Sequence, residues 1–148
     1  MNRFHNLARG IFIDNDSVLL VRAKGADNTF LPGGHIEFGE RAEVTLRREI
    51  REEIGLDANV GAFLGVIEHS WPSATRENHE FNFLFRFDIS NVTSASRIES
   101  LEPDLEYIWV KLPDLAEFNL QPSPLIDLLN TSDPFKTSYW ASTLHWNS

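Results

Sequence analysis

Hydrophobic and polar residues alternate in several short stretches of the chain, and this alternation predicts strands. Within residues 80–89, a phenylalanine stands at every second position from Phe81 to Phe87, so one face of the strand would be aromatic. Apolar runs over residues 63–68 and 107–111 predict two further strands. These stretches favour a protein built around a sheet.

Two other apolar runs, residues 7–14 and 17–22, flank the pair Asn15-Asp16. Short polar pairs of this kind join antiparallel strands, so we expect the two runs to form a β-hairpin. Residues 91–102 are rich in Ser, Thr and Asn and predict an irregular, mobile loop.

Residues 41–54 have the periodicity of a helix. Their apolar side chains recur at every fourth position, namely Ala42, Leu46, Ile50 and Ile54. Gly55 then stands where a helix commonly ends, and residues 125–130 predict a second, short helix. Strands on both sides of a helix, mostly joined by hairpins, predict an α/β fold in which helices pack on a mixed sheet.

The first predicted helix carries an unusual concentration of acids near its end. Glu49 and Glu53 lie one turn apart with Glu52 between them, so the three carboxylates project within an arc of roughly 100°. Like charges at this spacing repel, and the negative end of the helix dipole disfavours them further. A solvated helix crossed by ion pairs is the ordinary explanation, but neither Glu49 nor Glu53 has a basic residue four positions later. A bound Mg²⁺, which prefers oxygen ligands, would relieve both problems.

Composition limits the classes of protein that remain. The 148 residues, 42% hydrophobic and 24% charged, are typical of one globular domain, which we expect to span residues 1–148. The absence of cysteine excludes disulfides, zinc–thiolate sites and a cysteine nucleophile. A net charge of −9 argues against a basic nucleic-acid-binding surface. A small phosphorylated substrate stays compatible with this charge if a cation lies between it and the acids.

Targeting signals are not apparent in the sequence. The first fourteen residues lack the apolar core of a signal peptide, and the longest apolar-leaning uncharged stretch, residues 58–67, is too short to cross a bilayer. We therefore expect a cytoplasmic protein with no membrane association.

The loop before the acidic helix completes a family signature. The residues that carry it are Gly34, Glu40, Arg48, Glu49, Ile50, Glu52, Glu53, Gly55 and Leu56. They match every fixed position of the Nudix box, Gx5Ex7REUxEExGU with U aliphatic, and chance agreement at a given start is on the order of one in a billion. The chain thus resembles the Nudix (MutT-type) hydrolases over roughly residues 7–130.

This resemblance implies a Nudix-type α/β/α sandwich that uses Mg²⁺ or Mn²⁺ to hydrolyse a nucleoside diphosphate linked to another group. By position in the box, the metal would be bound by Glu49, Glu52 and Glu53 with help from the Gly33 carbonyl. A salt bridge between Glu40 and Arg48 would shape the loop.

The general base is left open by the resemblance, because the family varies in which glutamate serves. It is either Glu52 or Glu53, or a glutamate outside the box. Glu80 is the first such candidate, followed by Glu77 and Glu106, although an exposed acid is the more common explanation for each of them.

Candidate substrate contacts outside the acids are Arg22, Lys24, Gly34, His35 and Trp71. Arg22 and Lys24 close a predicted strand and could meet phosphates, while Trp71 could stack on a base or pack on the core. Pro72 lies sixteen residues after Leu56, a spacing similar to that of the marker proline in ADP-ribose-hydrolysing relatives.

Several questions stay open from the sequence. The substrate could be a nucleoside triphosphate, ADP-ribose, a nucleotide sugar or a dinucleoside polyphosphate. Two alternatives to an enzyme stay open: a non-catalytic nucleotide-binding or sensing module on the same fold, and a structural domain with a charged helix. The aromatic C-terminal tail, about residues 131–148, would cover an apolar patch, seal a homodimer or, as a lower-ranked option, close over the substrate.

Overall fold

The structure is a computed structural model that describes residues 2–131, 133–135 and 138–144. Its elements in chain order are β1 (Arg3–Ile11), β2 (Ile13–Asp14), β3 (Ser17–Ala23), β4 (Gly33–His35), α1 (Ala42–Ile54), β5 (Ala58–Pro72), β6 (Glu77–Ile89), β7 (Leu105–Lys111), the 3₁₀ helix η1 (Leu112–Asp114), α2 (Pro124–Leu129) and β8 (Tyr139–Ser142).

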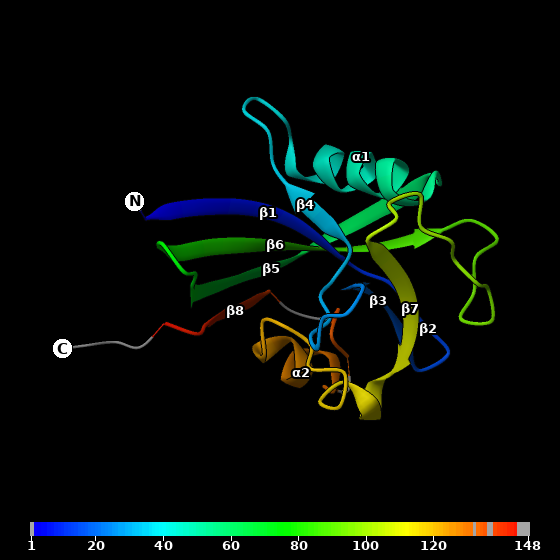
Figure 1. Ribbon diagram of the computed structural model, residues 1–148. Coiled ribbons are helices and arrows are strands. Elements are labelled where there is room, and N and C mark those ends of the chain that lie inside the picture. The colour runs from blue at the N-terminus through cyan, green and yellow to red at the C-terminus, as the bar shows by residue number, and fades with distance from the viewer. Residues whose placement is uncertain (1, 132, 136–137, 145–148) are drawn as a thin grey trace.

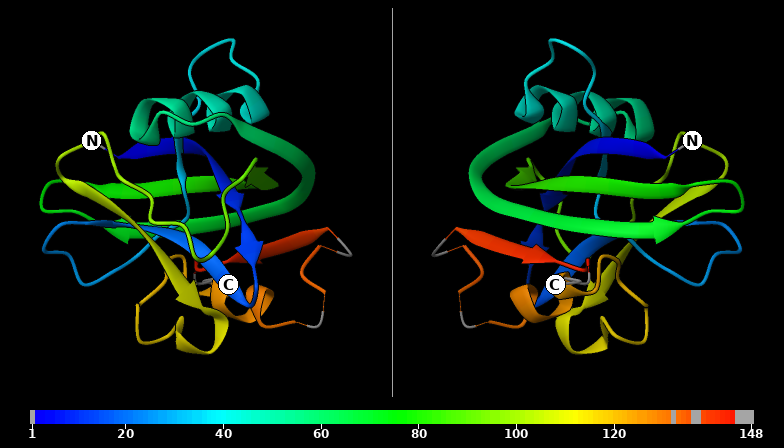
Figure 2. Two further views of the ribbon diagram at one scale, coloured as in Figure 1. Left: turned by 90° about the vertical axis from the view of Figure 1, so that its right-hand side faces the viewer. Right: turned by 90° about the vertical axis from the view of Figure 1, so that its left-hand side faces the viewer.

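The strands form two sheets. The larger sheet has the order β4-β1-β6-β5-β8, in which β1 runs parallel to β6 and β8 parallel to β5, while the other neighbours are antiparallel. The smaller sheet, β2-β3-β7, is antiparallel. Helix α1 lies on one side of the larger sheet, and α2 lies on its other side (Figures 1 and 2). The predicted α/β fold with a mixed sheet and helices on both sides is therefore confirmed.

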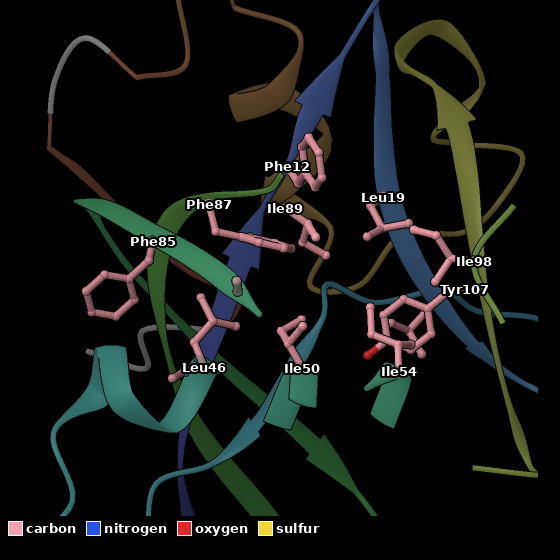
Figure 3. Packing of buried hydrophobic residues seen from close by; sticks show 13 residues of the cluster. Phe12, Leu19, Leu46, Ile50, Ile54, Phe85, Phe87, Ile89, Ile98 and Tyr107 are labelled. Carbon is pink, nitrogen blue, oxygen red and sulfur yellow. The ribbon is translucent and has the colours of Figure 1, made fainter. Parts of the chain in front are cut away.

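Two apolar clusters hold these layers together. Between α1 and the larger sheet, Leu46 and Ile50 meet Phe87, the aromatic face that the alternation predicted (Figure 3). On the opposite face of the sheet, Leu84 packs with side chains of α2 such as Leu125. Because β6 is buried on both faces over this part, it fixes the positions of both helices relative to the sheet.

The predicted hairpin is only partly correct. The run of residues 7–14 is split between β1, which belongs to the larger sheet, and β2, which belongs to the smaller one. The turn at Asn15 and Asp16, with φ of 51° and 63°, joins β2 to β3 as expected. Both faces of this run find apolar partners, so hydrophobicity alone could not show where the chain passes from one sheet to the other.

Two strands were not predicted at all. β4 contains Gly33 and Gly34, which leave no alternating side chains to reveal it. β8 lies in the aromatic tail and adds an edge strand to β5, where Tyr139 and Ala141 pack against the apolar cluster that contains Leu84. His145 and Trp146 of the aromatic tail lie outside the described part of the chain.

The remaining predictions hold with adjusted boundaries. The strand predicted over residues 63–68 is the middle of the fifteen-residue β5, and the helix predicted over residues 125–130 is α2. The loop 91–102 has no regular structure, but Ile98 anchors it in the cluster beneath α1. In the described ranges, no helix is both long and apolar enough to span a bilayer.

Candidate active site

The acidic stripe of α1 lies against the glycine pair of β4. A Cβ atom added to Gly34 would sit only 2.5 Å from the carboxyl carbon of Glu49. Gly33 has a φ of +140°, and a Cβ there would collide with the backbone carbonyl of Ala8. Both positions therefore require glycine: Gly34 because the backbone passes directly beside the Glu49 carboxylate, and Gly33 because of its positive φ and the nearby Ala8 carbonyl.

Burial perturbs two of the three acids. Desolvation raises the pKa of Glu53 to about 7, although a hydrogen bond from the hydroxyl of Tyr107 on β7 opposes this rise. Desolvation also raises the pKa of Glu49, with Arg48 opposing it. These carboxylates are held in a site that penalises their charged forms, which is the condition that a bound cation would reverse.

Arg48 ties the loop before α1 to the helix. Its Nε and Nη2 donate to the two carboxylate oxygens of Glu40 at 2.8 and 3.0 Å, and the pair holds the pKa of Glu40 at about 2. The hydroxyl of Thr45 donates to Glu40 at 2.6 Å, and Arg48 Nη2 also donates to the carbonyl of His35 at 3.1 Å. The structure thus places Glu40 and Arg48 in the contact expected from the box.

The acids are turned toward protein partners rather than toward one common point. Arg48 Nη1 donates to Glu49 at 3.1 Å and to Glu52 at 3.3 Å, while Glu53 accepts from Tyr107. Within the described ranges, no three His, Asp or Glu side chains are close enough together to hold a metal ion. The donor types nevertheless fit Mg²⁺ or Mn²⁺, since the stripe offers carboxylate oxygens, two with raised pKa values, beside a glycine backbone that leaves them space.

A cavity of about 510 Å³ opens on the face of the larger sheet that points away from α1. It is lined by Arg9, Asn28, Phe30, His69, Trp71, Glu80, Asn82, Gln121 and Pro122. Aromatic and polar side chains converge here, in a volume suited to a nucleotide-sized ligand. Of the residues predicted from sequence, Trp71 and Glu80 lie in this cavity.

Arg9, which the sequence did not single out, lines this cavity, and the charges of Glu53 and Glu49 act on its guanidinium. Its guanidinium lies 5.3 Å from the ring centre of Phe30, and Nη1 donates to the carbonyl of Leu31 at 3.1 Å. Burial lowers the pKa of Arg9, and the nearby charges of Glu80 and Glu53 oppose this shift. Among the described residues, no carboxylate comes within 4.0 Å of the guanidinium, so most of its N–H donors remain available to a ligand.

Other candidate residues are not brought into the cavity. Arg22 pairs with Glu106 at 2.6 Å between β3 and β7. Lys24 is not among the lining residues either, and Glu77 lines a separate hollow near Phe4. The ring of His35 contacts His5 at 2.9 Å. An interaction partner within the fold therefore accounts for Arg22 and Glu106, and their proposed catalytic or substrate roles gain no geometric support.

Three further residues were missed because each looks ordinary in the sequence. Asn82 is 2% exposed on β6, His69 lies opposite Glu80 on β5, and Tyr107 begins a predicted strand. The only available signal concerned Arg9, a charged residue inside the apolar run of residues 7–14. Asn82 stands between Phe81 and Phe83, where the alternation predicts a polar residue, so its burial could not be predicted from the pattern.

The fold and this site define a class of protein, namely an α/β protein with a mixed sheet, an acidic helix and a nucleotide-sized cavity. The model of the NUDIX domain matches residues 4–129. The chain belongs to this family, and it is a Nudix hydrolase that acts on phosphoanhydride bonds.

Several known proteins are similar to this chain. A nucleoside triphosphatase, NudI, of Klebsiella pneumoniae is 30% identical over 131 residues, which cover 78% of this chain and 89% of the relative. An ADP-ribose pyrophosphatase of Methanocaldococcus jannaschii is 36% identical over 85 residues, 54% and 48% of the two chains. Among solved structures, a MutT protein from Bacillus halodurans has a TM-score of 0.68 at 19% identity, with 93% and 88% covered. The last likeness shows the fold alone.

Proposed function

We propose that this Nudix hydrolase cleaves a phosphoanhydride bond of a nucleoside 5′-triphosphate, with a divalent cation at the acids of α1. The observation that carries the proposal is that Arg9 lines the cavity while the charges of Glu53 and Glu49 on α1 act on its guanidinium. An elongated ligand with a nucleoside at one end and cation-bound phosphates at the other would match this order of groups. The similarity to nucleoside triphosphatase NudI, which extends over most of both chains, supports the triphosphate class.

Each group has a distinct task in this proposal. Glu49, Glu52 and Glu53 hold Mg²⁺ or Mn²⁺, and the Gly33 carbonyl assists. The cation, when bound, neutralises phosphate charge and helps to orient the attacking water. Arg9 donates to a phosphate oxygen on the side away from these acids, because a guanidinium presents several N–H groups to such an anion.

Trp71 and Phe30 provide aromatic surface for the base in the cavity. Glu80 stays the first candidate for a general base outside the box; it lines the cavity, and its charge acts on the guanidinium of Arg9. Glu106 is a suitable control for Glu80, since it is engaged with Arg22.

The decisive experiment is a substrate panel. Nucleoside triphosphates, ADP-ribose, nucleotide sugars and dinucleoside polyphosphates would be assayed with Mg²⁺ and with Mn²⁺, and the products identified. We expect the highest kcat/KM for a triphosphate, and a loss of at least 100-fold in kcat for Glu53→Gln. A preference for ADP-ribose would refute the triphosphate assignment. If the wild type hydrolyses no compound of the panel faster than Glu53→Gln does, the catalytic proposal is refuted and a binding module is favoured.

Glu80→Gln and Glu106→Gln separate the general base from a substrate contact. If Glu80 is the base, Glu80→Gln lowers kcat by at least 100-fold with little change in KM, while Glu106→Gln leaves both constants unchanged. A rise in KM alone for Glu80→Gln would show that this carboxylate binds substrate instead.

A further inference from the structure

The C-terminal strand reaches the wall of the cavity. β8 runs parallel to β5 from the pair Gly65–Tyr139 to the pair Glu68–Ser142, as Figure 1 shows at the free edge of the larger sheet. Gly65 has a φ of +139°, and a Cβ there would collide with the backbone of Tyr139. The sheet is therefore shaped to accept this strand, which ends beside the part of β5 that enters the cavity.

The residue after β8, Thr143, contacts a cavity residue directly. Its Oγ1 lies 2.7 Å from Nδ1 of His69, and the backbone N–H of Ser70 donates to the same oxygen at 3.2 Å. The backbone N–H of Thr143 donates to the carbonyl of Glu68 at 3.0 Å, which fixes the threonine along β5. A residue near the C-terminal end thus sets the orientation of an imidazole that lines the proposed substrate site.

Ser142, the residue before, makes a similar contact on the other face of the strand. Its hydroxyl donates to Glu68 at 2.9 Å, and Glu68 in turn contacts His79 at 2.8 Å. Neither Glu68 nor His79 lines the cavity. Ser142 and Thr143 are therefore a matched pair of neighbouring hydroxyls, of which only Thr143 contacts a cavity residue.

The contact with Thr143 constrains which nitrogen of His69 faces a ligand. Burial lowers the pKa of His69, so at neutral pH the ring is uncharged, with one N–H donor and one acceptor nitrogen. The Thr143 oxygen already accepts from Ser70, and its own proton can then be donated to Nδ1 of His69. In that arrangement Nε2 carries the ring proton and acts as a donor in the cavity.

We propose that Thr143 is a positioning residue: it holds His69 with its Nε2–H donor directed into the cavity, where the donor meets an oxygen or nitrogen acceptor of the nucleobase. His69 is then a specificity-determining contact at the end of the substrate opposite the metal. β8 contributes to the substrate site by placing Thr143 beside His69. The identity of the ligand rests on the proposed function, whereas the orientation of His69 does not.

Three variants test this proposal. Thr143→Val removes the hydroxyl and keeps the shape, Thr143→Ser keeps the hydroxyl, and Ser142→Ala removes the neighbouring hydroxyl. Losing one hydrogen bond that orients a ligand contact should raise KM for the preferred triphosphate about fivefold, with kcat changed less than twofold. Thr143→Ser restores the wild-type KM, and Ser142→Ala leaves KM unchanged.

A second measurement needs no turnover. Ring ¹⁵N chemical shifts of His69 report the tautomer, which we expect to be Nε2–H in the wild type and in Thr143→Ser, and mixed in Thr143→Val. Titration with a nucleoside monophosphate should shift the His69 signal. If the wild type hydrolyses no triphosphate, the proposed function fails while the tautomer test still decides the role of Thr143.

Defined results would overturn the inference. An unchanged tautomer and an unchanged KM in Thr143→Val would show that the hydroxyl does not position His69. An equal rise of KM in Thr143→Ser would show that packing, not the hydroxyl, matters. If Thr143→Val proves too unstable to measure, Thr143→Ala replaces it under the same criteria, with melting temperatures recorded for every variant.

Discussion

The hydrogen bond from Tyr107 to Glu53 leads to a quantitative prediction about metal affinity. Tyr107 is 6% exposed, and its hydroxyl donates to a carboxylate whose pKa is already raised from 4.5 to about 7. A hydrogen bond to a charged group contributes about 1.5–3 kcal/mol, which corresponds to about one to two pKa units. Tyr107→Phe should therefore raise the pKa of Glu53 to roughly 8–9.

A carboxylate must lose its proton before it binds a metal, so this shift reduces Mg²⁺ affinity at neutral pH. At pH 7 about half of Glu53 is ionised in the wild type, against roughly one tenth to one hundredth in Tyr107→Phe. The variant should need about 5- to 50-fold more Mg²⁺ at pH 7, and the difference should shrink to about twofold or less by pH 9.

The assay is the Mg²⁺ concentration for half-maximal activity between pH 6 and pH 9, repeated without nucleotide as the Mg²⁺-induced rise in melting temperature. Tyr139→Phe is a suitable control, because it removes a hydroxyl that donates to the carbonyl of Pro124. An Mg²⁺ requirement of Tyr107→Phe equal to that of the wild type at pH 7, or a gap that does not depend on pH, would refute the reasoning.

Three further predictions concern the same loop and helix. Folding raises the pKa of Glu53, so in the absence of metal the folded state binds the proton of this carboxyl more tightly than the unfolded chain does. The resulting contribution to the free energy of unfolding is complete below about pH 4.5 and is lost as the pH rises to about 7. Urea unfolding should show Glu53→Gln to be less pH-dependent than the wild type by about 2 kcal/mol across that window, a value reduced for partial solvation. Gly34→Ala should displace Glu49 and lower kcat by at least tenfold, whereas Gly61→Ala, where a Cβ meets only ordinary contacts, should leave kinetics unchanged. Glu40→Gln removes the ionised partner of Arg48 and should weaken Mg²⁺ activation about 10- to 100-fold, measured by Mg²⁺ titration of activity.

The helix and its acids could be predicted because their signal is local. Leu46 and Ile50 fall on one face at helical spacing, and Gly55 ends the helix with a φ of 73°. Every determinant of the acidic stripe thus lies within about twenty residues, and the box adds the loop that packs against it.

The cavity could not be predicted in the same way, because it is assembled from strands that meet only through sheet topology. Arg9 and Glu80 come together because β1 runs parallel to β6, a pairing between segments some seventy residues apart. The hydrophobic pattern could not reveal this pairing, and it led instead to a continuous hairpin over residues 7–22. Trp71, an aromatic candidate from the sequence, lines the cavity, whereas Arg22 is paired with Glu106.

The charges of the site explain why the acids and the cavity belong to one function. On the α1 side, Glu49 and Glu53 are held where burial disfavours their negative charge; on the cavity side, Arg9 is held where burial disfavours its positive charge. These groups act on one another through space, yet among the described residues Arg9 forms no ion pair with either acid. Glu49 does pair with Arg48, and Glu53 accepts from Tyr107, yet burial still raises the pKa of both acids. A ligand that brings a divalent cation to one side and phosphate oxygens to the other would compensate both at once, whereas a cation or an anion alone would compensate only one.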